Sequence, residues 1–279
     1  MSKNWAEWIR SGDWANEDQA KIPMLPAHVR ELAELAFDPE VSARRIAATV
    51  AKDPVLAMQV IRMANSAASA SATTITDIND AVVRLGTQSV RNTVVAGCLN
   101  AQLVDPRIYG TRGQEIVDHS LGTALLASTL AKRHGTSGEM FLGGLLHDIG
   151  KLLILKLAHD VRENSDNAPM QHEVDAVLAD RHAHMGGWLA GRWSMPPALS
   201  DPIVWHHDPE WAEDHTSAAI IYSANRLAHR YGFGCEPDPG DELLADPILA
   251  EIGIDEMRLA ALDAEAPALY NTTKHVLRM

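Results

Sequence analysis

The segment Phe141–Leu155 reads FLGGLLHDIGKLLIL, and its only polar side chains are those of His147, Asp148 and Lys151. The surrounding apolar run predicts a buried helix, which we extend over residues 139–158. Burying a polar group without a partner costs about 2–7 kcal/mol, and burying a charge costs more. His147 and Asp148 therefore require partners inside the fold, either a metal ion or other side chains.

The spacing of these three residues suits a site. Lys151 follows Asp148 by three residues and His147 by four, so all three can lie toward one face of a helix. An imidazole beside a carboxylate is a suitable ligand pair for a divalent cation such as Mn, Fe, Mg or Zn. A lysine next to them can bind a phosphate oxygen. The alternative is structural: His147 and Asp148 form a buried hydrogen-bonded pair that fixes helix packing.

Further imidazoles occur in other predicted helices of the second half. They are His119 in VDHSLGTALLASTLA, His182 in DRHAHMGGWLAGRW and the pair His206–His207 in VWHHDPEW. His182 lies on the inward stripe of its helix, whereas His184 points to a different side and is expected at the surface. The remaining histidines are expected to be hydrogen-bonded core residues or exposed residues: His28, His134, His159, His172, His215, His229 and His275.

Composition and pattern predict an all-α fold. The hydrophobic share is 46% and the charged share 22%, both ordinary for a globular protein, while aromatic residues make up only 5%. Ala, Leu and Met fill the periodic segments, and unbranched side chains favour helix over strand. No segment shows the sustained period-two alternation that indicates a sheet. Besides residues 139–158, helices are predicted near residues 115–134, 173–193, 197–206 and 216–231.

Local signals predict helix ends in the first half. Ser42, Asp53 and Asp77 are suited to cap helix N-termini, and Gly86 is suited to end a helix in a left-handed conformation. Two further helices are predicted here: HVRELAELAF (28–37) and TQSVRNTVVAGCLNAQL (87–103).

Stretches rich in Pro, Gly and charge divide the chain. The best interior boundary is LVDPRIYGTRGQE (103–115), and GCEPDPGDE (234–242) marks a second linker. The first residues carry Trp5, Trp8 and Trp14, which we expect to dock on the main body; a partner-binding arm is the alternative. The predicted parts are a Trp-rich arm (1–20), an N-terminal helical lobe (21–105), a second helical lobe (115–230) and an acidic helical extension (231–279).

The charge balance argues against nucleic-acid binding. The formal net charge is −13, from 37 acidic and 24 basic residues. A duplex binder needs basic side chains that neutralise phosphates and release counterions, so we expect no nucleic-acid partner. Several arginines gather in the first third, and we interpret them as exposed helix-face residues: Arg44, Arg45, Arg62, Arg84 and Arg91.

Targeting and cysteine signals point to the cytoplasm. The N-terminal sequence MSKNWAEWIRSGDW is too polar for a signal peptide, and no apolar run approaches the length of a membrane span. The two cysteines, Cys98 and Cys235, provide neither a disulfide framework nor a CxxC zinc motif. We therefore expect a cytoplasmic protein without a membrane partner.

Taken in order, four motifs resemble a known superfamily. They are HS (119–120), GLLHDIGKLL (144–153), HAHMGGWLAGRW (182–193) and HH (206–207). This order is similar to that of the HD superfamily of metal-dependent phosphohydrolases, which includes the HD-GYP cyclic-dinucleotide phosphodiesterases. Upstream, IPMLPAHVRELAELAFDPEVSARRIAATVAKDPVLAMQVIRMANSA (22–67) and INDAVVRLGTQSVRNTVVAG (78–97) resemble the HDOD family.

The HDOD resemblance covers about residues 21–230. It implies an all-helical HD-superfamily-like bundle with an N-terminal helical lobe. It also implies a bacterial signalling role with protein partners, commonly without hydrolase activity.

The resemblance also assigns residues. His119, His147, Asp148, His182 and one or both of His206 and His207 match metal-ligand positions of the superfamily. Lys151 matches the lysine that follows HD in the HD-GYP branch, which makes Asp148 and Lys151 the candidate catalytic residues. Because the histidines also share inward helical positions, we predict that His119, His147, Asp148 and His182 converge in one pocket.

Two departures from the superfamily pattern weaken the case for catalysis. No GYP motif follows HHDPEW, which argues against hydrolysis of cyclic-di-GMP. The late aspartate of the superfamily corresponds to Asn225, in IIYSANRLAH. An amide is a neutral and poorer ligand, so the site lacks one charge and a complete two-metal site is not expected.

Two functions follow from these observations. The favoured one is a regulatory signalling module whose helical surfaces bind protein partners and whose pocket is vestigial or regulatory, able to hold a divalent metal but not an efficient hydrolase. Fold resemblance by itself is weak evidence for activity. The alternative is a metal-dependent phosphohydrolase acting on a nucleotide or phosphodiester. In that case a metal would lower the pKa of bound water, Asp148 would orient the water, and Lys151 would bind phosphate.

Overall fold

The computed structural model describes residues 4–16, 31, 41–65, 74–90, 92, 105–164, 168–238 and 242–278. Every regular element within these ranges is a helix or a 3-10 turn, and none is a strand. The predicted all-α fold is therefore confirmed. Among these same residues, no helix combines the length and the apolarity needed to cross a bilayer.

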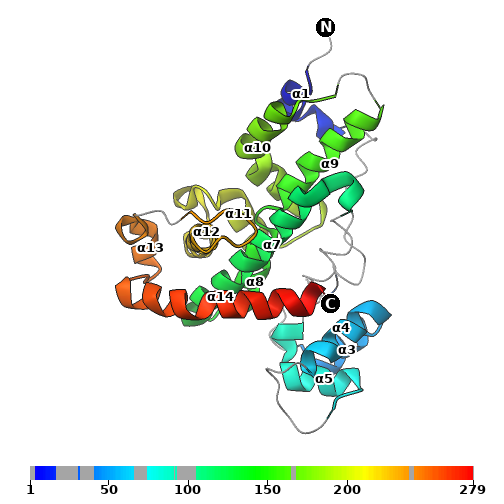
Figure 1. Ribbon diagram of the computed structural model, residues 1–279, viewed down its shortest axis with the longest axis vertical. Helices are drawn as coiled ribbons and strands as arrows, with labels where there is room; N and C mark the ends of the chain where they lie inside the picture. The colour runs from blue at the N-terminus through cyan, green and yellow to red at the C-terminus, as the bar shows by residue number, and fades with distance from the viewer. Residues whose placement is uncertain are drawn as a thin grey trace.

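A bundle of six helices forms the larger body. Helix α7 runs through its middle, packs along α8, and also contacts α12 and α9 (Figure 1). Helix α10 packs against both α9 and α11. The bounds are α7 (Pro106–Ala131), α8 (Ser137–Leu146), α9 (Ile149–Asn164), α10 (Gln171–Arg192), α11 (Pro197–Trp205) and α12 (His215–Arg230).

A smaller lobe consists of α3 (Ala43–Val50), α4 (Pro54–Ala64) and α5 (Ile78–Leu85). These helices pack on one another, and the C-terminal helix α14 (Glu256–Arg278) contacts both α7 and α4. Figure 1 shows α14 crossing the molecule between the bundle and this lobe. A short helix, α13 (Pro247–Glu251), precedes α14 and packs on α12.

The predicted caps of the small lobe are confirmed. The Ser42 side chain accepts a hydrogen bond from the backbone N–H of Arg45, and Asp77 accepts one from that of Asn79. Asp53 accepts in the same way at the start of α4, from Leu56. Gly86 ends α5 with a positive φ of 80°, as predicted, although its ψ of 149° is extended rather than helical.

Parts of the first half lie outside the described residues. They include the predicted helix at 28–37 apart from Glu31, and most of the one at 87–103. Three of the four first-third arginines that the structure describes have the expected exposure, and Arg91 lies outside the described residues. Arg44, Arg45 and Arg62 are exposed, and Arg84 is half-buried.

The tryptophans of the N-terminal arm pack on the bundle. Trp5 and Trp14 are buried and Trp8 is partly buried against the core. Helix α1 (Trp5–Ser11) packs on α10. Just after α1, the ring of Trp14 lies edge to face against that of Trp188, with the ring centroids 4.5 Å apart. The prediction that this arm docks on the protein's own body is confirmed.

One predicted helix is wrong. The segment 139–158 forms two helices: α8 ends at Leu146, α9 begins at Ile149, and His147 and Asp148 occupy the turn between them. His147 Nδ1 donates to the carbonyl of Gly144, one of the carbonyls left free at the end of α8. The sequence is apolar on both sides of the break and the break is two residues long, so hydrophobic periodicity could not reveal it.

The sequence signals at 103–115 also have a different meaning from the one predicted. From Asp105 onward this stretch begins α7 rather than a linker: the Asp105 side chain caps the helix and Pro106 takes its first position. The helix is interrupted at Gly110, whose φ of 57° and ψ of −152° are not helical. Residues that suggested a linker are thus a helix cap and a kink. The division of the chain into four parts stays a prediction.

Candidate metal centre and pocket

The predicted ligands come from five segments of the bundle and meet around Asp148. All are buried except His207, which is exposed. The convergence predicted for His119, His147, Asp148 and His182 is confirmed. The members are His119 on α7, His147 and Asp148 between α8 and α9, His182 on α10, His206 and His207 after α11, and Asn225 on α12.

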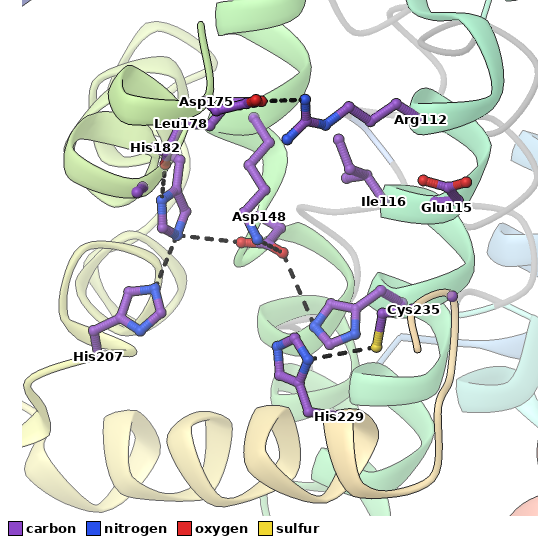
Figure 2. Close-up of a pocket in the computed structure, with 14 residues that line it drawn as sticks. Arg112, Glu115, Ile116, Asp148, Asp175, Leu178, His182, His207, His229 and Cys235 are labelled. Carbon is purple, nitrogen blue, oxygen red and sulfur yellow. Dashed lines mark hydrogen bonds and ion pairs between the residues drawn. The ribbon is translucent and has the colours of Figure 1, made fainter. Parts of the chain in front are cut away.

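Both carboxylate oxygens of Asp148 face imidazole nitrogens. Oδ2 lies 3.4 Å from His147 Nε2 and 4.0 Å from His119 Nε2. Oδ1 lies 3.3 Å from His182 Nε2 and 3.8 Å from His206 Nε2. Asp148 is thus the centre of the cluster. Figure 2 shows its carboxylate between His182 on one side and the side chains of His229 and Cys235 on the other.

A tight helix contact sets this position. Gly150, at the start of α9, packs directly on the backbone of α10: a Cβ at this residue would lie 1.9 Å from the carbonyl oxygen of His182. Only glycine allows the two backbones to approach so closely. This contact brings Asp148 within reach of His182.

Four histidines are oriented in the same way by the backbone. Each places Nδ1 against a carbonyl oxygen: His119 at 3.1 Å, His147 at 2.8 Å, His182 at 2.6 Å and His206 at 2.8 Å. A carbonyl only accepts, so each Nδ1 carries the proton and each Nε2 turns a lone pair inward. Histidines that bind metals are usually held by such a hydrogen bond from the other ring nitrogen.

The inward nitrogens lie close enough to one another for one cation to contact several of them. His182 Nε2 is 3.2 Å from His206 Nε2 and 2.9 Å from His207 Nε2. Burial lowers the pKa of His182 to about 4 and that of His206 well below its ordinary value, so both rings are neutral near pH 7. Two lone pairs that face each other at 3.2 Å repel, and a shared positive charge removes the repulsion.

Two buried atoms of the cluster have no hydrogen-bond partner among the described residues: His147 Nε2 and Asp148 Oδ1. Unsatisfied buried polar atoms are rare in native proteins and often indicate an ion or ligand. Burial lowers the pKa of His147 to about 3, so this nitrogen also offers a lone pair. The donor set, imidazole nitrogens around a carboxylate, fits a divalent transition metal.

Asp148 remains ionised despite its burial. Burial alone would raise the pKa of its carboxyl group, but the Lys151 ammonium holds that pKa well below its ordinary value. Lys151 Nζ lies 2.6 Å from Asp148 Oδ2. The lysine therefore balances the charge of the carboxylate from the cavity side.

Asn225 lies where the resemblance implied, beside the cluster. Its side-chain oxygen is 2.8 Å from His119 Nε2, and exchange of the amide N and O would let the amide donate to that nitrogen. The residue is buried. An uncharged amide thus occupies the place from which a carboxylate would face the same imidazole.

A cavity of about 490 Å³ opens beside the cluster. Its walls include Asp148, Lys151, His182 and His207, and an ion pair between Arg112 on α7 and Asp175 on α10 joins two of its sides (Figure 2). This volume is typical of small-molecule sites. Lys151 and Arg112 give the cavity two cationic groups that an anionic ligand could contact.

Two side chains of the pocket with metal-binding donor atoms, those of His229 and Cys235, were not predicted as site residues from the sequence. His229 was assigned to the core or the surface, yet its ring centroid lies 4.5 Å from that of His119. Cys235 Sγ lies 3.4 Å from His229 Nδ1, and both residues line the cavity. The spacing of four between Asn225 and His229 was the available signal, since it places both on one helix face. His184, in contrast, is exposed as expected.

Two known proteins illustrate the similarity of this chain to others. An uncharacterized protein of Treponema pallidum is 28% identical over 202 residues, which is 67% of this chain and 38% of that protein. Ribonuclease Y of Thermus thermophilus is 32% identical over 117 residues, 42% of this chain and 17% of the enzyme. The chain thus spans well under half the length of these relatives.

A solved structure matches nearly the whole chain. It is an HDOD domain protein of unknown function from Geobacter sulfurreducens, with a TM-score of 0.73 at 24% identity, covering 97% of this chain and 96% of that one. At this identity the match shows the fold alone. The model of the HDOD domain family matches residues 22–209, which is most of the chain. The chain therefore belongs to the HDOD family.

Proposed function

We propose that this chain is a regulatory protein of bacterial signal transduction. Its histidine–aspartate cluster binds a divalent metal, and it hydrolyses phosphodiesters poorly or not at all. The observation that carries the proposal is the pair formed by Asn225 and His119. Converging imidazole nitrogens support metal binding, while the uncharged amide against His119 Nε2 leaves the site one negative charge short.

The residues that would hold the metal are those whose donor atoms face the centre: His119, His147, Asp148, His182, His206 and His207. When bound, a divalent metal of this kind lowers the pKa of a coordinated water toward neutrality. The chain's own contribution is orientation. Backbone carbonyls fix the rings of all these histidines except His207, and Lys151 keeps Asp148 ionised beside the cavity.

Contacts between the pocket and the C-terminal helix support a signalling role. The carbonyl of Phe233 accepts a hydrogen bond from Nδ1 of His119. The phenyl ring of Phe233 stacks on the ring of Tyr270 of α14, with the ring centroids 4.1 Å apart. Asp118, next to His119, forms an ion pair with Lys274 of α14 at 3.0 Å. Because α14 also contacts α4, a change at His119 has a continuous path of contacts to the small lobe. Protein partners would read such a change at the helix surfaces.

The test combines metal binding with turnover. Wild type and Asp148→Asn are titrated with Mn²⁺ by calorimetry after chelator treatment, and both are assayed with a chromogenic phosphodiester. We expect the wild type to bind Mn²⁺, the variant to bind it at least about ten-fold more weakly, and turnover to stay near background in both. Efficient wild-type hydrolysis would contradict the regulatory role, and a lack of Mn²⁺ binding would contradict the metal site.

The second candidate is a metal-dependent phosphohydrolase acting on a nucleotide or phosphodiester. It is favoured by one observation, the cavity in which Lys151 and Arg112 stand beside the candidate ligands. The similarity to part of a ribonuclease adds support. In this candidate Asp148 orients the attacking water and Lys151 binds a phosphate oxygen. Metal-dependent turnover that Lys151→Ala abolishes, with Mn²⁺ affinity retained, would favour it over the regulatory role.

A further inference from the structure

The loop YGFGCE (231–236) holds a thiol against the pocket. Gly232 and Gly234 have φ values of 66° and 71°, which glycine adopts without strain. At Gly234 a Cβ would lie 2.3 Å from both the carbonyl oxygen of Glu115 and the backbone nitrogen of His119. The loop backbone therefore rests directly on the backbone of α7. The next residue, Cys235, is thereby fixed beside the cavity.

Cys235 faces two imidazoles rather than the carboxylate. Its Sγ lies 3.4 Å from Nδ1 of His229, and one donor atom each of His119, His229 and Cys235 lies within 4.8 Å of the others. Figure 2 shows the His229 and Cys235 side chains directed toward each other below Asp148. In tetrahedral zinc sites, bond lengths of about 2.3 Å to sulfur and 2.0–2.1 Å to nitrogen put the two donors about 3.6 Å apart. The observed spacing is close to this value.

We propose that His119, His229 and Cys235 form a thiolate-containing site for a zinc-type cation, with its fourth position open to the cavity. On binding, the Cys235 thiol releases its proton to solvent and the thiolate sulfur bonds the metal. This site goes beyond the proposed function, with which it shares His119. Because Nδ1 of that ring is bound to the carbonyl of Phe233, only Nε2 has a lone pair, and His119 can bind the cation of one site at a time. Soft thiolate selects Zn²⁺, whereas the group around Asp148 offers a carboxylate that suits Mn²⁺.

Cobalt serves as the spectroscopic probe, because a bond between Co²⁺ and thiolate sulfur gives a near-ultraviolet charge-transfer band that nitrogen and oxygen ligands do not. The full chain, freed of metal, is titrated with Co²⁺ as wild type, Cys235→Ser, Cys98→Ser and His182→Ala. Cys98→Ser is the matched control for loss of a thiol. His182→Ala removes a donor from the other group only.

We expect the band in wild type, Cys98→Ser and His182→Ala, and its loss in Cys235→Ser. A band that persists in Cys235→Ser would overturn the proposal, as would wild-type protein that lacks the band at saturating Co²⁺. The proposed function fails separately: Mn²⁺ binding absent from a wild type that shows the band removes the histidine–aspartate metal site and leaves the thiolate site standing.

A second measurement avoids dependence on the folding of Cys235→Ser. In the Cys98→Ser protein, alkylation by iodoacetamide reports on Cys235 alone, since the chain has two cysteines. We expect Zn²⁺ to slow alkylation at least about ten-fold, because the metal occupies the sulfur lone pair, while an equal concentration of Mn²⁺ leaves the rate unchanged. Equal rates with and without Zn²⁺ would overturn the proposal.

Discussion

The small lobe of α3–α5 and the bundle of α7–α12 are both helical, but their interiors differ in kind. In the described part of the small lobe, Thr49 is the one buried polar side chain, among residues such as Ile46, Val60 and Val82. The bundle instead buries a carboxylate and several imidazoles in its centre. An apolar interior stabilises its fold without a ligand, whereas the bundle interior carries atoms that need one. The difference predicts separate responses to acid, to packing changes and to metal.

Acid should give the largest effect, and mainly on the bundle. In the unfolded chain these histidines titrate near their ordinary pKa of about 6.5, but burial lowers the pKa of His147 to about 3 and of His182 to about 4. Between the folded and the unfolded pKa values, only the unfolded chain binds a proton at each histidine. The free energy of unfolding therefore decreases as the pH falls from about 6.5 toward 4. From pH 7 to 5 each residue should lower the free energy of unfolding by about 2 kcal/mol, or about 4 kcal/mol together.

Tryptophan fluorescence can follow this loss selectively. All seven tryptophans lie outside α3–α5, so their emission reports on the bundle and its docked arm. Urea unfolding of the metal-free protein at pH 7 and pH 5 measures the difference. Equal unfolding free energies at the two pH values would show that the cluster is not held neutral by burial.

Gly150→Ala should produce the next largest effect, about 3 kcal/mol of destabilisation, because its Cβ would overlap the backbone of His182. Gly191, on the same helix as His182, provides the matched control: a Cβ there meets nothing within 4 Å. Gly191→Ala should stabilise by about 0.5–1 kcal/mol. Thermal melting of the two variants checks this pair, and similar melting temperatures would contradict the close contact between α9 and α10.

Asn225→Asp should raise Mn²⁺ affinity about ten-fold, equal to about 1.4 kcal/mol, since a charged oxygen ligand binds this hard cation better than an amide does. Without metal, the variant should be less stable than wild type, because a second buried carboxylate would lie near Asp148. Calorimetry and melting curves with and without Mn²⁺ measure both effects. If Mn²⁺ stabilises the variant no more than the wild type, Asn225 does not face the metal.

Ile46→Val, in the small lobe, should have the smallest effect. Ile46 is fully buried, and loss of one methylene there should lower stability by about 1 kcal/mol. Metal affinity should stay at the wild-type value, because none of the candidate metal ligands around Asp148 belongs to this lobe. A change in Mn²⁺ affinity would instead indicate coupling between the lobe and the pocket, through the contacts of α14.

The fold could be predicted in large part because local rules govern it. Ser42 and Asp77 cap helices as expected, since a short side-chain acceptor satisfies free N–H groups from a neighbouring position in the chain. The break between α8 and α9 could not be predicted, because the residues on both sides of it are apolar. Pro106 and Gly110 fit either a linker or a capped and kinked helix, and the structure shows the capped and kinked helix.

For the site, the sequence alone determined which donor types are present and that buried His147 and Asp148 need partners. The order of histidines further indicated which of them meet. Only the tertiary structure decided how they meet: the carbonyls that orient each Nε2, the contact of Gly150 that seats Asp148, and the loop that brings Cys235 to His229. The reason is that hydrogen-bond direction and backbone approach depend on segments far apart in the chain, such as Phe233 and His119. Residue spacing carries no information about such distances.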